Sequence, residues 1–221
     1  MKRIVVFGTS DFAIQVSSYL KNDSDYEIVA YTVDSEYNEG KTFLDLPVVD
    51  FEEVQKIYPP EEFGMFVAVG YHKLNKTRES KFNEAKLKGY KLVSYVCSKN
   101  IVWSDLELGE NCFVMEGNII QMPVKILDNV FVGIGNGIGH NTLIRENCFL
   151  TSKVMIGGFC TIGKNTFIGL GAIIRDKIVI GENNILGAGS IILKSTNNNS
   201  SYLTKSTPIT KVDIGFIMNL I

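Results

Sequence analysis

The stretch that decides the fold is VFVGIGNGIGHNTLI, residues 130–144. Aliphatic residues recur in it at Val132, Ile138 and Ile144, six positions apart. A strand spaces its apolar residues two apart and a helix three or four apart, so neither element explains this period. The stretch also holds His140, one of only two histidines in the chain.

The six-residue period continues in both directions without a slip of phase. Its sixteen positions are Val102, Leu108, Val114, Ile120, Ile126, Val132, Ile138, Ile144, Leu150, Ile156, Ile162, Ile168, Ile174, Ile180, Leu186 and Ile192. Such a repeat predicts a parallel β-helix, in which three hexads close a coil of about 18 residues around an aliphatic axis. Glycine follows the aliphatic residue in half of the hexads, and we expect it to allow the turn at each corner.

The four cysteines form no C-x-x-C pair, and with two histidines a zinc cluster is poorly supplied. Cys112, Cys148 and Cys160 each stand two positions before an in-phase aliphatic residue, where the side chain also points inward. We therefore predict reduced thiols packed in the core.

The first 96 residues show a different pattern. Apolar strands are predicted at 2–8, 26–34, 63–70 and 90–96, with helices at 12–20 and 72–89 between them. This alternation predicts a small Rossmann-like α/β domain with ligand sites at the carboxyl ends of its strands. We expect domains at 1–96 and 97–194, followed by a tail at 195–221 whose Asn/Ser run predicts a loop.

Composition excludes several classes of function. Hydrophobic residues make up 45% of the 221 residues and the formal net charge is -2, which favours neither nucleic acid nor an anionic membrane as partner. No apolar run reaches the roughly 18 residues of a spanning helix, and the start does not resemble a signal peptide. We expect a soluble, cytoplasmic protein.

His140 occupies an outward position that holds Glu or Lys in other hexads, so it could be an ordinary polar turn residue. Residues 18 apart stack on successive coils, about 4.8 Å apart. This places Gly158, preceded by Gly157, beside the imidazole, and leaves a wall of bare backbone that a substrate can approach. Asn141 could fix the orientation or tautomer of the ring.

The hexads, the VVFGTSDFA start at 5–13 and GIGHN at 137–141 resemble left-handed β-helix acetyltransferases of the sialic-acid O-acetyltransferase and bacillosamine N-acetyltransferase group. The resemblance implies an α/β N-terminal Rossmann-like domain followed by a left-handed parallel β-helix. It also implies a homotrimer that binds acetyl-CoA in the groove between the β-helices of two copies and needs no metal. The implied acceptor is a nucleotide-linked amino sugar, for example a dTDP- or UDP-4-amino-4,6-dideoxy sugar for surface polysaccharide such as O-antigen.

The resemblance also implies roles for residues. His140 would be the general base and the Gly158 N–H would stabilise the oxyanion. Asn141 stands where relatives often carry an acidic residue. An amide can orient the imidazole of His140, but it does not stabilise the imidazolium as a carboxylate does. The residues implied for acetyl-CoA are Gly157, Gly158, Leu170, Ala172, Ala188 and Lys194. Those implied for the acceptor are Gly8, Ser10, Asp11, Asp34, Gly70, Tyr71, His72, Lys73 and Asn75.

The sequence itself also supports the residues implied for the acceptor, although some of them could instead be ordinary loop residues. GTSDFA at 8–13 is an incomplete dinucleotide fingerprint, which argues against NAD and fits a turn that holds a sugar nucleotide. Asp34 could accept a hydrogen bond from a base or be a loop aspartate. Residues 70–75 open a helix where amides and Lys73 could meet phosphates, and His72 could contact substrate or belong only to the loop.

The sequence is also compatible with two other functions. The first is O-acetylation of a sugar such as sialic acid, although a hydroxyl needs more activation than an amine. The second is a non-catalytic scaffold, against which the glycine wall beside His140 argues. A zinc-dependent prism of the carbonic-anhydrase type needs three histidines and is rejected.

Overall fold

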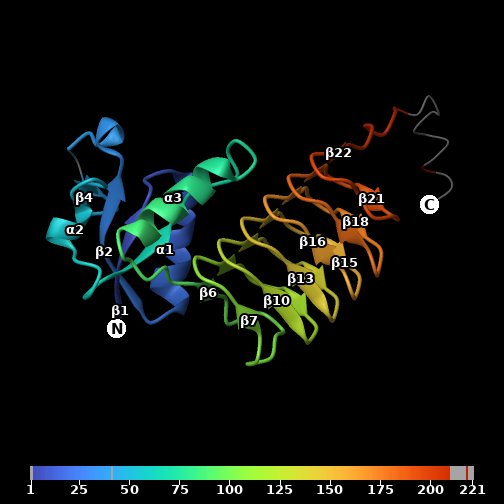
Figure 1. The fold of residues 1–221 in the computed structure, drawn as a ribbon, viewed down its shortest axis with the longest axis horizontal. Coiled ribbons are helices and arrows are strands. Elements are labelled where there is room, and N and C mark those ends of the chain that lie inside the picture. Colours follow the sequence, from blue (N-terminus) through green and yellow to red (C-terminus); the bar gives the residue numbers. More distant parts are fainter. Residues whose placement is uncertain (1, 41, 210–217, 219–221) are drawn as a thin grey trace.

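The structure is a computed structural model that describes residues 2–40, 42–209 and 218. An α/β region, blue to green in Figure 1, is followed by a stack of short strands, green through yellow to red, which we call the prism. Within the described residues, no helix is both long and apolar enough to cross a bilayer.

The N-terminal region is a five-stranded sheet with a helix on each face. The strand order is β3-β4-β2-β1-β5, with β3 antiparallel and the others parallel. Val16 and Leu20 of α1 pack on one face, and Phe82 and Ala85 of α3 pack on the other. The strands are β1 (Lys2–Phe7), β2 (Tyr26–Val33), β3 (Thr42–Phe43), β4 (Leu46–Asp50) and β5 (Gly64–Val67). The helices are α1 (Asp11–Asp23), the 3-10 turn η1 (Ser35–Tyr37), α2 (Val54–Ile57) and α3 (Lys76–Leu87).

The structure of this region differs from the prediction in three respects. The β3–β4 hairpin and α2 were not predicted, because their segments are short and mixed in polarity. Helix α3 begins at Lys76 and not at residue 72, because residues 73–75 have positive φ. The predicted strand at 90–96 is divided between the two parts of the molecule. Leu92 forms a single bridge to Met65, whereas β6 (Tyr95–Val96) pairs with the prism.

The prism consists of three parallel sheets, as the hexads predict. Paired strands are 18 residues apart, for example Phe131 with Phe149 and Ile138 with Ile156. One sheet contains β7 (Glu107–Leu108), β10 (Val124–Ile126), β13 (Thr142–Ile144), β16 (Thr161–Ile162) and β19 (Val179–Ile180). The second contains β6, β8 (Phe113–Val114), β11 (Phe131–Val132), β14 (Phe149–Leu150), β17 (Phe167–Ile168), β20 (Ile185–Leu186) and β22 (Ser201–Tyr202). The third contains β9 (Ile119–Ile120), β12 (Gly137–Ile138), β15 (Met155–Ile156), β18 (Ile173–Ile174) and β21 (Ile191–Ile192).

The predicted aliphatic axis is confirmed. From Val114 to Ile192 every in-phase residue is buried, and the first two, Val102 and Leu108, are half-buried against the same core. Cys112, Cys148 and Cys160 are free thiols in this core, as predicted. Burial raises the pKa of Cys148 to about 12, so this thiol stays protonated and unreactive at neutral pH.

The prediction about the corner glycines is wrong in its physical reason. The glycines that follow the aliphatic residues do not have positive φ. Glycine is required there because coils approach closely: a Cβ on Gly139 would lie 2.4 Å from the nitrogen of Gly158. The turn is made three residues before the aliphatic residue, at a position that we call the turn slot. Positive φ occurs in turn slots at Asn111, Gly117, Asn129, Gly135, Asn141, Asn147, Lys153, Phe159, Asn165, Gly171, Lys177, Asn183 and Gly189.

The chain continues along the prism after residue 194 as far as Tyr202. The prediction of a loop is wrong for Ser201 and Tyr202, which form β22 and pair with Ile185 and Leu186, 16 residues earlier. The rest of the predicted tail from residue 210 lies outside the described residues, except Met218.

The three sheets present different outer faces. The docked face (β6 to β22) carries a ladder of Phe113, Phe131 and Phe149, on which Phe12 of α1 packs. The apolar face (β9 to β21) exposes Ile119, Met155, Ile173 and Ile191, with exposed fractions from 45% for Ile173 to 62% for Ile191. The polar face (β7 to β19) carries Glu107 and Lys125, which form an ion pair.

Candidate active site

His140 lies on the corner between the apolar and polar faces, after β12 and before β13. We call this corner, with residues 139–141, 157–159, 175–177 and 193–195 on successive coils, the histidine edge. The side chain of His140 is exposed, while its backbone is anchored. Its N–H donates to Gln121 Oε1 at 3.2 Å, and its carbonyl accepts from the Phe159 N–H at 2.8 Å.

The neighbouring amide determines the tautomer of the imidazole. His140 Nδ1 lies 2.9 Å from Asn141 Oδ1. Because an amide oxygen can only accept, Nδ1 carries the proton and donates it. In the neutral imidazole this tautomer leaves the lone pair on Nε2, which is the form a general base requires.

The lone pair of Nε2 faces the wall formed by Gly158. A Cβ added to Gly158 would lie 3.1 Å from Nε2 and 3.2 Å from Cε1, so glycine leaves room that any other residue would fill. Among the described residues the Gly158 N–H has no acceptor. A basic nitrogen and an unused amide donor thus lie side by side on an open surface, which suits a reaction that takes up a proton and develops negative charge on oxygen.

The residues implied for acetyl-CoA divide between two edges of the apolar face. Lys194 lies on the histidine edge, three coils beyond His140. Leu170 and Ala188 are exposed on the other edge, between the docked and apolar faces. Ala172 is completely buried in the core, so its side chain cannot contact a ligand on the surface. One chain alone therefore does not bring these residues together around His140.

The first loop implied for the acceptor follows β1. Gly8 has φ +116°, and a Cβ there would lie 2.8 Å from the carbonyl oxygen of Ala68, so only glycine fits. Ser10 is the N-cap of α1, and Asp11 lies in its first turn. This arrangement leaves backbone amides at the carboxyl end of the sheet, where α/β folds bind ligands.

Asp34 follows β2 at the same end of the sheet, but a lysine already binds it. Lys81 Nζ lies 2.7 Å from Asp34 Oδ1 and also contacts the rings of Phe7 and Phe51. The contact of Asp34 with a nucleotide base stays a prediction. Lys81 contacts Oδ1 of Asp34, so Oδ2 is the oxygen that this lysine leaves available.

The loop 70–75 joins the two parts of the molecule. The ring of Tyr71 packs on Phe149 and Phe167 of the docked face, with centroids 5.1 and 5.0 Å away. His72 Nδ1 lies 3.3 Å from Thr77 Oγ1. Asn75 is fully buried, so it does not face solvent, whereas Gly70 is half-buried and Lys73 is exposed.

The two halves of the candidate site lie on different sides of the prism. The acceptor loops lie on the docked side, and the histidine edge is the corner opposite the docked face (Figure 1). Sequence reasoning missed Gln121, Phe159 and Lys81. The repeat could have identified Gln121 and Phe159, because each is 19 positions from His140 and therefore belongs to an adjacent coil.

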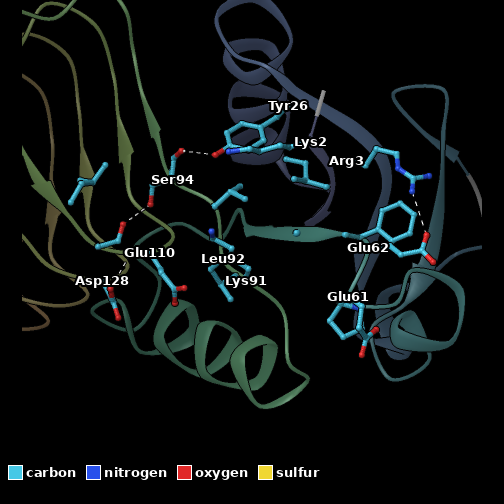
Figure 2. Close-up of a pocket in the computed structure, with 17 residues that line it drawn as sticks. Lys2, Arg3, Tyr26, Glu61, Glu62, Lys91, Leu92, Ser94, Glu110 and Asp128 are labelled. Atoms are coloured by element: carbon cyan, nitrogen blue, oxygen red, sulfur yellow. Dashed lines mark hydrogen bonds and ion pairs between the residues drawn. The ribbon is translucent and has the colours of Figure 1, made fainter. Parts of the chain in front are cut away.

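A separate cleft of about 690 Å³ lies at the amino ends of β1 and β5. Figure 2 shows the Arg3–Glu62 ion pair on one side and Glu110 and Asp128 of the prism on the other. None of the predicted site residues lines this cleft. The described side chains also contain no group of three or more His, Cys, Asp or Glu that could hold a metal ion.

Comparison with known proteins finds a matching family model and solved structures of the same fold. The bacterial transferase hexapeptide (six repeats) family matches residues 159–194. PerB from Caulobacter crescentus, solved with CoA and GDP-perosamine, aligns with a TM-score of 0.81, 22% identity and coverage of 92% of this chain and 95% of that one. No curated protein sequence gives a match.

Two further solved structures share the fold. The acetyltransferase domain of PglB from Neisseria gonorrhoeae aligns with a TM-score of 0.77 and 20% identity, over 92% of this chain and 97% of that one. WeeI from Acinetobacter baumannii aligns with a TM-score of 0.77 and 19% identity, over the same shares. The fold inferred from the sequence, an α/β region followed by a hexapeptide β-helix, is thereby confirmed.

Proposed function

We propose that this chain transfers the acetyl group of acetyl-CoA to the amine of a nucleotide-linked amino sugar, with His140 as general base. The observation that carries the proposal is that His140 Nε2, the nitrogen that holds the lone pair in the neutral ring, lies against Gly158, whose N–H is unused among the described residues. The similarity in fold to PerB, which was solved with CoA and GDP-perosamine, supports the choice of substrates.

The reaction follows from these two groups. The amine of the sugar attacks the thioester carbonyl, and His140 Nε2 takes the proton that the nitrogen loses. The carbonyl oxygen becomes an oxyanion, which the Gly158 N–H stabilises. When the intermediate collapses, the C–S bond breaks and the imidazolium returns its proton to the leaving thiolate. Holding both substrates on one surface supplies the rest of the acceleration.

The position of His140 favours an active site shared between copies of the chain. The apolar face that borders the histidine edge is an exposed aliphatic stripe, which in a soluble protein marks a contact surface. Its other edge carries Leu170 and Ala188. A closed ring of copies would set the histidine edge of one against a neighbouring copy, and we propose a homotrimer with acetyl-CoA between prisms.

Asn141 favours an amine over a hydroxyl as the acceptor. An amide orients the imidazole but does not stabilise the imidazolium as a carboxylate does, so the base is of moderate strength. An uncharged amine already has an available lone pair, whereas a hydroxyl must lose its proton during attack. O-acetylation of a sugar remains the second candidate. A role in surface polysaccharide synthesis in the cytoplasm agrees with the proposed substrate.

A panel assay tests the proposal. Purified protein is incubated with acetyl-CoA and GDP-, UDP- or dTDP-linked amino sugars, with sialic acid as the hydroxyl acceptor, and free CoA is measured. We expect release with at least one amino sugar and none with His140→Ala. Acetyl-CoA binding without turnover on any acceptor would contradict the proposed substrates, and absence of acetyl-CoA binding would favour a scaffold.

A further inference from the structure

Phe159 is unusual for its position in the chain. It occupies a turn slot with φ 59°, where the other residues of positive φ are asparagine, glycine or lysine. A bulky aromatic residue rarely adopts this conformation, because its Cβ crowds the backbone. Such outliers persist where the residue serves a purpose that offsets the strain.

The ring of Phe159 contacts the catalytic imidazole. The two centroids are 5.0 Å apart and the planes cross at 83°, the edge-to-face geometry that aromatic pairs prefer. Yet the side chain of Phe159 stays 52% exposed, so core packing does not explain its presence. The backbone bond from Phe159 N–H to His140 O has counterparts at equivalent corners, for example from Asn129 to Glu110, and so does not require an aromatic residue.

We propose that Phe159 is a positioning residue that holds the His140 ring so that Nε2 faces Gly158. Rotation of the imidazole by half a turn would break the hydrogen bond to Asn141 and turn a carbon atom, in place of Nε2, toward Gly158. At this exposed site a single hydrogen bond opposes that rotation only weakly. The ring of Phe159 closes the side of the imidazole toward the next coil and disfavours that rotation. This inference rests on the proposed function for its catalytic meaning, but not for its geometry.

The decisive variant is Phe159→Asn, because asparagine is the commonest residue in the turn slots. The variant relieves the strain and so keeps the fold. Phe159→Gly provides a second test on the same principle. We expect kcat to fall about 10-fold with the KM for acetyl-CoA unchanged, since a small displacement of a catalytic group has large effects. Phe159→Tyr, which keeps the ring, should restore kcat.

A measurement without turnover separates this inference from the proposed function. Long-range ¹H–¹⁵N spectra report the tautomer of each imidazole, and with only two histidines the signals of His140 are assigned by loss in His140→Ala. We expect a single Nδ1–H tautomer in the wild type and in Phe159→Tyr, and a mixture in Phe159→Asn. An unchanged tautomer and unchanged kcat in Phe159→Asn would overturn the proposal.

Two controls exclude a purely structural role. Lys177→Asn introduces the same residue at the turn slot of the next coil, and both asparagine variants should unfold at or slightly above the wild-type temperature. Sedimentation of Phe159→Asn should match the wild type. A change in its oligomeric state would instead assign Phe159 to a contact between copies and overturn the positioning role.

Discussion

Two asparagines in equivalent turn slots differ in what their side chains do. Asn129 (φ 59°) is fully buried, accepts from Asn111 Nδ2 and donates to Asn147 Oδ1, both at 2.8 Å. Asn141 (φ 58°) is exposed and turns its oxygen to His140. The first lies on the corner that α3 covers, where Arg78 donates to the Asn111 carbonyl. The second lies on the open histidine edge.

The comparison shows that the repeat determines the conformation of a slot, whereas its surroundings determine its role. Both asparagines are in place because their side chains tolerate positive φ. A covered corner turns the amides toward each other and produces a ladder that stabilises the stack. An open corner leaves the amide free to orient a reactive neighbour. The following predictions test this division between stability and chemistry.

The largest effect is expected on the chemical side. His140→Ala should lower kcat by about 10²- to 10⁴-fold, because it removes the proposed general base. The affinity for acetyl-CoA should be nearly kept, since binding depends on the groove and not on the imidazole. Steady-state kinetics and a separate binding titration measure the two quantities. Wild-type kcat in this variant would make His140 an ordinary turn residue.

On the structural side, Ile156→Ala should lower the free energy of unfolding by about 2 to 5 kcal/mol. Ile156 is 4% exposed and lies in the axis, where stacked coils cannot collapse into the space left by a lost side chain. Denaturant unfolding measures the change. An unchanged midpoint would mean that the assigned phase of the repeat is wrong.

The paired variants Asn129→Ala and Asn141→Ala test the comparison itself. Both place alanine at positive φ, so the backbone cost is shared. Asn129→Ala also leaves the buried Oδ1 of Asn147 without its donor and removes one of the two acceptors of Asn111 Nδ2. It should therefore be about 1 to 3 kcal/mol less stable than Asn141→Ala. Asn141→Ala should instead lose more activity. Equal stability and equal kcat in the two variants would remove the distinction between the corners.

The smallest effect is expected from Asn141→Asp. The carboxylate stabilises the imidazolium, which then gives up its proton only at higher pH. The low-pH limb of the kcat/KM profile should therefore shift upward by about one pH unit or less at this exposed site. An unchanged profile would show that residue 141 does not contact the imidazole in solution.

Much of the prism could be predicted because residues that stack on successive coils are separated by a fixed number of positions. A fixed coil length places Gly158 beside His140 and buries residues such as Ile138 and Ile174 without any knowledge of the fold. The same spacing does not reveal which way a side chain turns. The edge-to-face contact of Phe159 and the closeness of coils at Gly139 emerged only from the structure.

The α/β region was predicted less completely, because tertiary contacts decide its local structure. The segment at 90–96 has uniform strand character, but its two ends pair with different sheets. Lys81 lies on the charged face of the helix predicted at 72–89, and only the folded structure shows its ion pair with Asp34. Periodicity carries no information on either pairing.

The most direct test of the shared active site is to mix two defective variants. His140→Ala lacks the base, and Lys73→Glu should repel the phosphates of the acceptor at the other half of the site. If each site combines the histidine edge of one copy with the acceptor loops of another, random reassembly of an equal mixture restores about one quarter of the sites. We predict about that share of wild-type acetyl transfer after subunit exchange. Exchange demonstrated by mass without any recovery of activity would contradict a site built from two copies.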